Sequence, residues 1–151
     1  MARVRTSHLE RTQVVAVPLH EAWTFYADPA NLEAITPPWL GFRIDSAPTA
    51  LGRGELLRYR LALFDVPVRW TTVIAQWHPP RSFVDVQLSG PYLLWEHTHR
   101  LSAVPGGTEI HDHVRYRVPG GVLAPLVDRL VARVLAAIFD YRSERTAELL
   151  S

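Results

Sequence analysis

Residues 122–150 have the sequence VLAPLVDRLVARVLAAIFDYRSERTAELL. Apolar side chains recur in it at steps of three and four residues, which is the spacing of one face of a helix. The members of this face are Leu123, Val127, Leu130, Val134, Ile138 and Tyr141. About 29 residues at ~1.5 Å per residue form a helix of ~43 Å. A helix of that length needs a broad surface to cover, so we expect the preceding part of the chain to form a sheet.

The preceding part of the chain has the patterns of short strands. One side of residues 54–64 is apolar, formed by Leu57, Tyr59, Leu61 and Leu63. Further strands are predicted at residues 12–17, 42–46, 66–77, 82–88, 92–104 and 108–118. Short turns, most of them with Pro or Gly, separate successive strands, which should therefore pair antiparallel.

Two short helices should follow the first strand, at residues 19–27 and 32–35. The first of them has its inner face at Ala22, Trp23 and Tyr26. Seven strands with one apolar face and one long amphipathic helix pack when the sheet curls around the helix. We therefore predict the α+β class and a single domain over residues 1–151. A curved sheet closed by one helix leaves a space between them, where ligands bind.

Composition excludes several classes of function. The formal net charge is +1, too small for a surface that binds nucleic acid. The chain has no Cys, and all sixteen basic residues are Arg, so thiolate chemistry, Schiff-base lysines and phosphate-loop lysines are excluded. The N-terminal residues lack a signal-peptide pattern, and no apolar run is long enough for membrane insertion. We therefore expect a cytoplasmic protein.

Two neighbouring strands place histidines and a carboxylate on one apolar face. On residues 95–103, His97 and His99 share the face of Trp95; on the next strand, Asp112 shares the face of Tyr116. A two-residue turn at Pro105-Gly106 would pair residues as follows: His99 with Asp112, His97 with Val114 and Trp95 with Tyr116. His111 and His113 fall on the opposite, outer face.

This inward cluster has three interpretations. A buried carboxylate needs a partner, which favours a His99–Asp112 dyad with His97 beside it. The three residues can be ligand anchors, acid/base groups of an enzyme, or a polar cluster that satisfies itself and fixes strand register. His-x-His is also a metal-ligand spacing with Asp112 as third ligand, but no fourth ligand is in view. The sequence therefore predicts neither a metal nor a cofactor.

Other candidate ligand-binding residues come from the aromatic residues and the long helix. Tyr59, Trp70 and Tyr116 should face the interior, as should Trp95. The helix should contribute Leu123, Val127 and Val134. The inner face of residues 82–88 is undetermined, because Val84, Val86 and Leu88 form one side and Phe83, Asp85 and Gln87 form the other. Gln87 and Asp85 are therefore weaker candidates than the histidines.

Several motifs resemble a known superfamily. They are Trp77-His78-Pro79-Pro80, Phe83-Val84-Asp85, Gly90-Pro91-Tyr92, Trp95-Glu96-His97-Thr98-His99, Gly106-Gly107-Thr108 with Asp112, and Ile138-Phe139-Asp140-Tyr141-Arg142. As a set, they resemble bacterial ligand-binding SRPBCC proteins, of the START, pollen-allergen and polyketide cyclase/dehydratase superfamily. The resemblance covers nearly the whole chain and implies the helix-grip fold with a hydrophobic cavity. It does not imply one activity.

Three functions follow from this combination. The leading hypothesis is the binding or carriage of a small hydrophobic molecule, such as a lipid, a polyketide or an isoprenoid. The alternative is a polyketide cyclase/dehydratase-like enzyme that uses His97, His99 and Asp112 for proton transfer. The third hypothesis is an interaction or stress-related module with a vestigial cavity. Self-association as a homodimer stays open.

Overall fold

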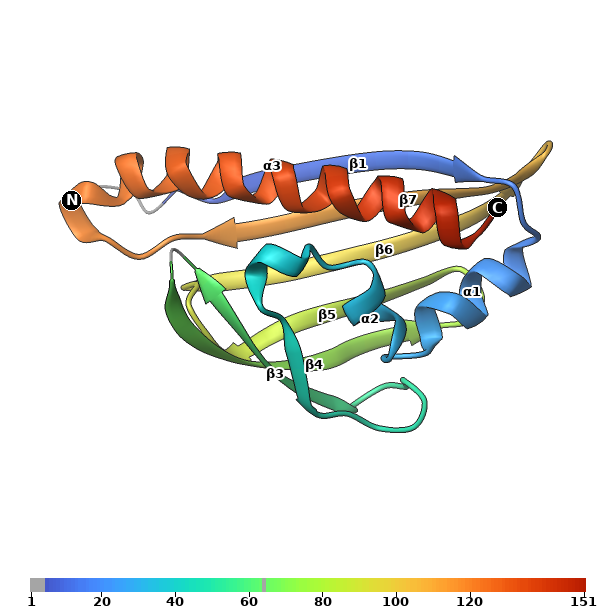
Figure 1. Cartoon of the computed structure of the whole chain (residues 1–151), viewed down its shortest axis with the longest axis horizontal. Coiled ribbons are helices and arrows are strands. Elements are labelled where there is room, and N and C mark those ends of the chain that lie inside the picture. Colours follow the sequence, from blue (N-terminus) through green and yellow to red (C-terminus); the bar gives the residue numbers. More distant parts are fainter. Residues whose placement is uncertain (1–4, 64) are drawn as a thin grey trace.

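The computed structural model describes residues 5–63 and 65–151, which form one curved sheet with three α-helices (Figure 1). Two short 3-10 turns also occur, at Pro38–Leu40 and Gly121–Leu123. The elements in chain order are β1 (Ser7–Val15), α1 (Leu19–Ala27), α2 (Asn31–Ala34), β2 (Arg43–Ser46), β3 (Leu56–Leu63), β4 (Val66–His78), β5 (Ser82–Ser89), β6 (Leu94–Val104), β7 (Gly107–Arg117) and α3 (Ala124–Leu149).

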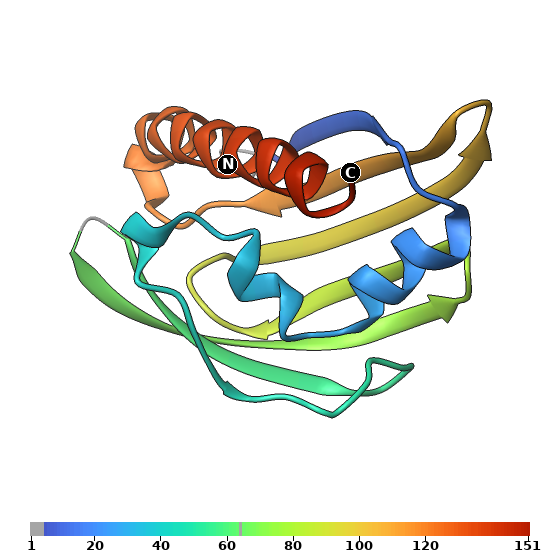
Figure 2. The ribbon, with the colours of Figure 1, turned by 45° about the vertical axis from the view of Figure 1, so that its right-hand side comes forward.

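The sheet has seven antiparallel strands in the order β1-β7-β6-β5-β4-β3-β2. Strands β2 to β7 form a meander, and β1 returns to lie beside β7. The sheet curves around α3, while α1 and α2 lie over the part of its inner face that α3 leaves open (Figure 2). This is the predicted helix-grip architecture. None of the described helices is both long and apolar enough to cross a membrane.

Strand β1 begins at Ser7, earlier than the predicted strand at residues 12–17. The mostly polar residues before Thr12 alternate between exposed and half-buried positions. The whole strand pairs with β7, from Ser7 opposite Tyr116 to Val15 opposite Thr108. Pairing with a long partner strand therefore outweighs the weak strand propensity of this segment.

Polar side chains also join β1 to α3. The Ser7 hydroxyl donates to Asp128 Oδ1 at 2.7 Å, and the Arg11 Nε–H donates to Asp140 Oδ1 at 3.4 Å. Further along, the Gln13 amide donates to the Ser143 carbonyl at 3.0 Å. These contacts hold the helix against the first strand over most of the strand's length.

The inner face of α3 differs from the predicted one. Its buried side chains are Leu135, Phe139 and Thr146, whereas Leu123 and Leu130 are 60% and 48% exposed. Apolar residues are so frequent in the first half of the helix that more than one helical stripe fits the sequence. The N-terminal turns of α3 reach past the end of β7 (Figure 1), and the helix residues that line the cavity described below begin only at Leu135.

Two clusters of buried side chains fill the ends of the interior. One cluster gathers around Trp23, Phe83 and Ile110, where α1 meets the sheet, and includes the predicted inner face of α1. The other gathers around Trp95 and Phe139, where α3 meets the sheet. The space between the clusters holds the site described next.

Candidate functional site

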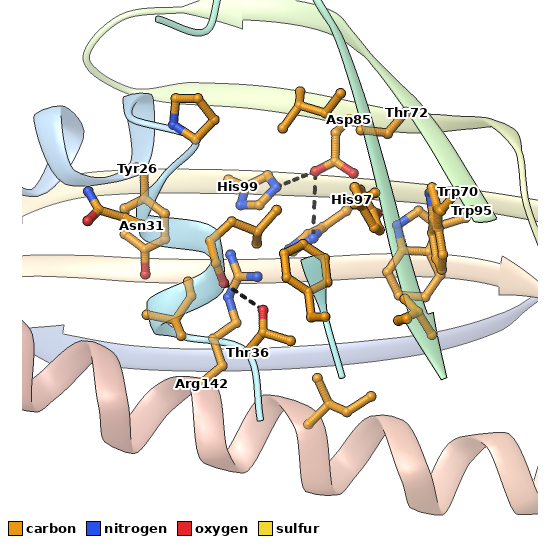
Figure 3. A pocket seen from close by; sticks show the side chains of 18 of the residues that line it. Tyr26, Asn31, Thr36, Trp70, Thr72, Asp85, Trp95, His97, His99 and Arg142 are labelled. Atoms are coloured by element: carbon orange, nitrogen blue, oxygen red, sulfur yellow. Dashed lines mark hydrogen bonds and ion pairs between the residues drawn. The ribbon is translucent and has the colours of Figure 1, made fainter. Parts of the chain in front are cut away.

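A cavity of about 160 Å³ lies between the sheet, α3 and the α1–α2 segment. Most of its walls are apolar. Its polar side chains come from α1, the α2 segment, the strands and α3: Tyr26, Asn31, Thr36, Tyr59, Thr72, Asp85, Tyr92, His97, His99 and Arg142. Figure 3 shows several of these groups pointing into the same space. The cavity therefore combines an apolar body with a small polar region.

The polar region is centred on four side chains, Asp85, His97, His99 and Asp112, which we call the His–Asp cluster. The His97 Nε2–H donates to Asp112 Oδ1 at 2.8 Å, and the His99 Nε2–H donates to Asp85 Oδ2 at 2.6 Å. A carboxylate can only accept, so the proton in each bond belongs to the ring. The hydrogen bond to Asp112 thus comes from His97, whereas His99, which the sequence analysis paired with Asp112, approaches it through Nδ1 at 3.4 Å.

The strand register explains this diagonal pattern. His99 lies opposite Asp112 on β7, and His97 lies opposite Asp85 on β5, as parity predicts for β6 and β7. Each carboxylate nevertheless bonds to the imidazole two residues away on β6. The two imidazole rings stack with centroids 3.6 Å apart at 25°. The register also shows that Phe83 and Asp85 form the inner side of β5, which the sequence left undetermined.

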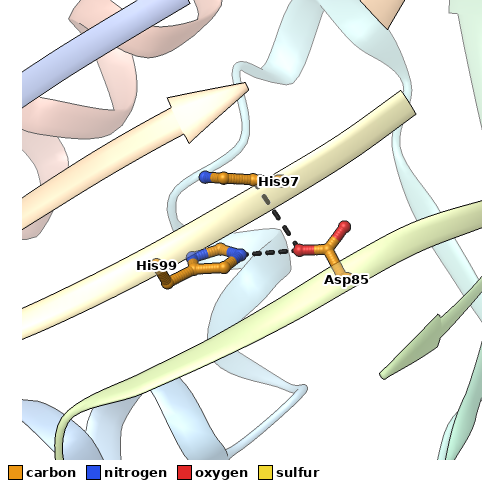
Figure 4. Close-up of side chains that lie close together, drawn as sticks. All are labelled: Asp85, His97 and His99. Atoms are coloured by element: carbon orange, nitrogen blue, oxygen red, sulfur yellow. Dashed lines mark hydrogen bonds and ion pairs between the residues drawn. The ribbon is translucent and has the colours of Figure 1, made fainter. Parts of the chain in front are cut away.

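Each carboxylate also approaches the second imidazole. Asp85 Oδ2 lies 3.7 Å from His97 Nδ1, and Asp112 Oδ1 lies 3.4 Å from His99 Nδ1. Figure 4 shows both imidazoles directed at the same oxygen of Asp85. Both ring nitrogens of each histidine therefore face carboxylates.

Burial and pairing set the charges in the cluster. Burial raises the pKa of both carboxyls, but the hydrogen bonds from His99 to Asp85 and from His97 to Asp112, with nearby positive charges, leave both below the ordinary value. Burial and the neighbouring His97 lower the pKa of His99 to about 4, against the opposing effect of Asp85. His99 is therefore neutral near pH 7, and its Nδ1 is a buried atom without a hydrogen-bond partner.

A cation that the sequence analysis did not select as a site residue reaches the site from α3. Arg142 lines the cavity, and its guanidinium lies 5.9 Å from the Tyr26 ring centroid and 5.6 Å from that of Phe139 (Figure 3). It forms no ion pair with any side chain that the structure describes, and its Nε is buried without a hydrogen-bond partner. The spacing Leu135, Phe139, Arg142, Thr146 is the signal that could have found it.

Aromatic side chains form the wall at the other end of the cavity. Tyr59 stacks on Trp70 at 5.5 Å, and Trp70 meets Trp95 edge to face at 5.1 Å. Tyr92, which the sequence analysis did not select, packs against both tryptophans. Burial raises the pKa of Tyr59 well above its ordinary value, so its hydroxyl stays protonated.

The structure brings some of the predicted site residues together and places others elsewhere. The predicted residues that line the cavity are Tyr59, Trp70, Trp95, His97 and His99. Their role toward a ligand remains a prediction.

The strand residues that do not line the cavity have other surroundings. The Gln87 amide donates to the Tyr92 carbonyl and accepts from the Tyr92 N–H, which closes the turn between β5 and β6. Asp112 lies behind His97, and Tyr116 is buried in the cluster around Trp95. The helix residues predicted to line the cavity do not: Leu123, Val127 and Val134. They precede the part of α3 that covers it.

Comparison with known proteins supports the fold and the family. The family described as polyketide cyclase / dehydrase and lipid transport matches residues 6–150. No curated protein sequence matches the chain. The aromatase/cyclase Zhui from Streptomyces sp. R1128 is 18% identical, with a TM-score of 0.77 over 97% of this chain and 94% of that chain.

Two further solved structures have the same architecture. Protein Ms6760 from Mycobacterium smegmatis is 19% identical, with a TM-score of 0.72 over 95% of this chain and 90% of that chain. Ara h 8.0201 is 14% identical, with a TM-score of 0.65 over 95% of this chain and 99% of that chain. At such identities the structures show a shared fold, and the family match over residues 6–150 adds the family. The chain therefore belongs to the polyketide cyclase / dehydrase and lipid transport family of the SRPBCC superfamily.

Proposed function

We propose that the protein binds and carries a small hydrophobic molecule, of lipid, polyketide or isoprenoid type, in the cavity between the sheet and α3. The observation that carries this proposal is a partly open, mostly apolar cavity that also contains three polar side chains of the His–Asp cluster and that of Arg142. In such a site the apolar walls supply affinity and the polar groups fix orientation. The family, whose description includes lipid transport, supports the same reading.

The size of the cavity limits what it encloses. A volume of about 160 Å³ is close to that of a cavity which holds one benzene molecule, whereas drug-sized ligands occupy roughly 300–1,000 Å³. The enclosed part of the ligand is therefore about one ring or a short acyl chain. A larger molecule would extend out through the open side of the cavity, or would need the α1–α2 segment to move away from the sheet.

Arg142 suggests where the polar end of the ligand lies. The Nε of half-buried Arg142 is buried without a partner, which is costly, and a guanidinium donates hydrogen bonds readily to carboxylate or carbonyl oxygens. In the proposed complex, an oxygen of the ligand meets Arg142 while its apolar body contacts Trp70 and Trp95. Both nitrogens of each cavity histidine face carboxylates, which favours binding over proton transfer to the ligand.

Benzene, phenol and benzoate test the proposal because they share one ring and differ in their polar group. NMR indole N–H signals are the readout: Trp70 and Trp95 line the cavity, whereas the other three tryptophans do not. We expect saturable shifts at these two signals. Ile138→Phe should fill the space and abolish them, whereas Leu130→Phe, at an exposed position of the same helix, should not. Ligand shifts absent from Trp70 and Trp95 would refute the proposal.

The orientation has its own test. Arg142→Met keeps the length of the side chain but removes its charge, and should weaken benzoate binding by about 1.5–3 kcal/mol while leaving benzene binding nearly unchanged. The matched control is Arg145→Met on the same helix, because Arg145 pairs with Glu148 at the surface. Equal loss for benzene and benzoate would show that Arg142 does not anchor the polar end.

A further inference from the structure

Three ligand-type atoms of the His–Asp cluster converge on one point. Asp85, His97 and His99 each offer one atom, and these atoms lie within 4.8 Å of one another. The nearest nitrogens to Asp85 Oδ2 are His99 Nε2 at 2.6 Å and His97 Nδ1 at 3.7 Å (Figure 4). Metal–ligand distances of ~2.0–2.2 Å place neighbouring ligand atoms roughly 3–3.5 Å apart, so small shifts suffice.

We infer that Asp85, His97 and His99 form a binding site for a divalent transition-metal ion such as Zn²⁺, with Asp112 orienting both imidazoles from behind. Two histidines and one carboxylate on one side of an ion are an established protein ligand set that leaves positions open. Because all three side chains line the cavity, water or a polar ligand atom can fill those positions. This inference does not depend on the proposed function.

The position of Asp112 fits the second layer of such a site. Metal-bound histidines donate their other ring N–H to a carboxylate or a carbonyl, which fixes the tautomer. The His97 Nε2–H already donates to Asp112, which leaves Nδ1 free on the side of Asp85. The orientation needed for metal binding is therefore present for His97 without any proton movement.

His99 supplies an independent observation. Its Nδ1 is buried without a hydrogen-bond partner, only 3.4 Å from Asp112 Oδ1. When the ion takes Nε2, the proton moves to Nδ1 and can be donated to Asp112. The same carboxylate then holds both imidazoles, and the fully buried nitrogen of the cluster that lacks a hydrogen-bond partner gains one.

The local charges favour a divalent cation. Asp85 and Asp112 bring two negative charges into contact with the imidazoles, and a doubly charged ion neutralises both. Arg142 opposes the ion, because its charge acts on both carboxyls, but it forms no ion pair with either. Asp85 would contact the ion directly and Asp112 would contact its imidazole ligands, so the attraction of the two carboxylates prevails over the repulsion from Arg142.

Titration of the metal-free protein with Zn²⁺ and Co²⁺ by calorimetry tests the site. The surface pair His8 and His113, with ring nitrogens 2.9 Å apart, is a competing site, so all variants carry His113→Ala. We expect one ion per chain and a Co²⁺ absorption spectrum typical of nitrogen and oxygen ligands. Asp85→Asn, which removes a ligand charge and little volume, should lower the affinity at least 100-fold.

Asp112→Asn separates a second-layer role from a ligand role. It leaves all three ligands in place and should weaken binding about 10–100-fold without changing the stoichiometry. Circular dichroism of each variant checks that the sheet is intact, and a rise in Tm with Zn²⁺ gives a second readout. Absence of saturable binding in the His113→Ala protein would overturn the inference, as would unchanged affinity in the folded Asp85→Asn variant.

Discussion

The β6–β7 strand pair presents the same histidine spacing on both of its faces. His97 and His99 lie on the inner face, buried between two carboxylates and stacked on each other. On the outer face, His113 stacks on His8 with centroids 5.2 Å apart and is 28% exposed. His111 and His113 on β7 repeat the spacing of His97 and His99 on β6, but with the opposite strand parity. Parity alone therefore separates the desolvated inner histidines from the solvated outer ones. The His-x-His motif by itself does not predict which environment its histidines have.

The largest expected difference between the faces is in stability. Asp112→Ala removes the acceptor of His97 and should cost about 1–3 kcal/mol, because a buried polar partner is left unmet. His111→Ala, at the neighbouring position of the same strand, should stay within about 0.5 kcal/mol. Chemical denaturation monitored by circular dichroism measures both. Similar losses would show that the inner cluster contributes no more than the surface.

The next effect is the response to acid in metal-free protein. The unfolded chain protonates a histidine near its ordinary pKa of 6.5, but burial lowers the pKa of folded His99 to about 4. Between these values the unfolded state binds more protons, so stability should fall with decreasing pH by up to about 1.4 kcal/mol per unit. The lowered pKa of Asp85 and Asp112 extends the loss below pH 4.

Two matched variants assign this slope to a face. His99→Gln should flatten the dependence of Tm on pH between 6.5 and 4, because it removes the inner imidazole whose pKa is lowered by burial. His113→Gln should leave most of this slope. The pKa of His113 is also lowered, but its side chain is partly open to water, so its contribution to the slope should be smaller than that of His99. A slope that disappears in the His113→Gln variant instead would assign acid sensitivity to the outer face.

A smaller difference concerns ion pairs. On the outer face, Arg115 Nη1 lies 3.3 Å from Glu96 Oε1 on the neighbouring strand. The two side chains are 40% and 34% exposed, respectively. A double-mutant cycle with Glu96→Gln and Arg115→Gln should give about 0.2–1 kcal/mol at low salt, and less at high salt. The corresponding cycle for His97 and Asp112 should be larger and insensitive to salt.

The smallest expected effect is at the outer histidine pair. His113→Ala removes the stacking on His8 at a site open to water and should change the free energy of unfolding by no more than about 0.5 kcal/mol. Thermal and chemical denaturation measure it. A loss comparable to that of Asp112→Ala would mean that the outer stack also stabilises the sheet substantially.

Most of the fold could be predicted from sequence because periodicity and turn residues mark each element. The β6–β7 register followed from parity and one short turn, and it is confirmed at Trp95, His97 and His99. The inner side of β5 could not be predicted, because both of its faces carry apolar residues. Register shifts in its pairing with β4, between Ile74 and Gln76 for example, also prevent simple counting across the sheet.

The candidate site was predicted less completely than the fold. Asp85 was ranked low because its orientation depended on that undetermined strand. Arg142 was missed because an arginine on an amphipathic helix is normally assigned to the exposed side. Leu123 was wrongly placed in the cavity because the helical pattern does not show where the sheet ends beneath the helix. Each error concerns a property of neighbouring elements that a single segment does not encode.

The edges of the sheet have a consequence for aggregation. An open sheet ends in two strands that could recruit strands of another chain. Here β1 is held to α3 through Ser7, Arg11 and Gln13, so a helix lies along that edge. The other edge, β2, is only four residues long and carries Arg43 and Asp45. Neither edge offers a long, flat and uncharged template, so the protein keeps an unclosed sheet without inviting intermolecular β-pairing.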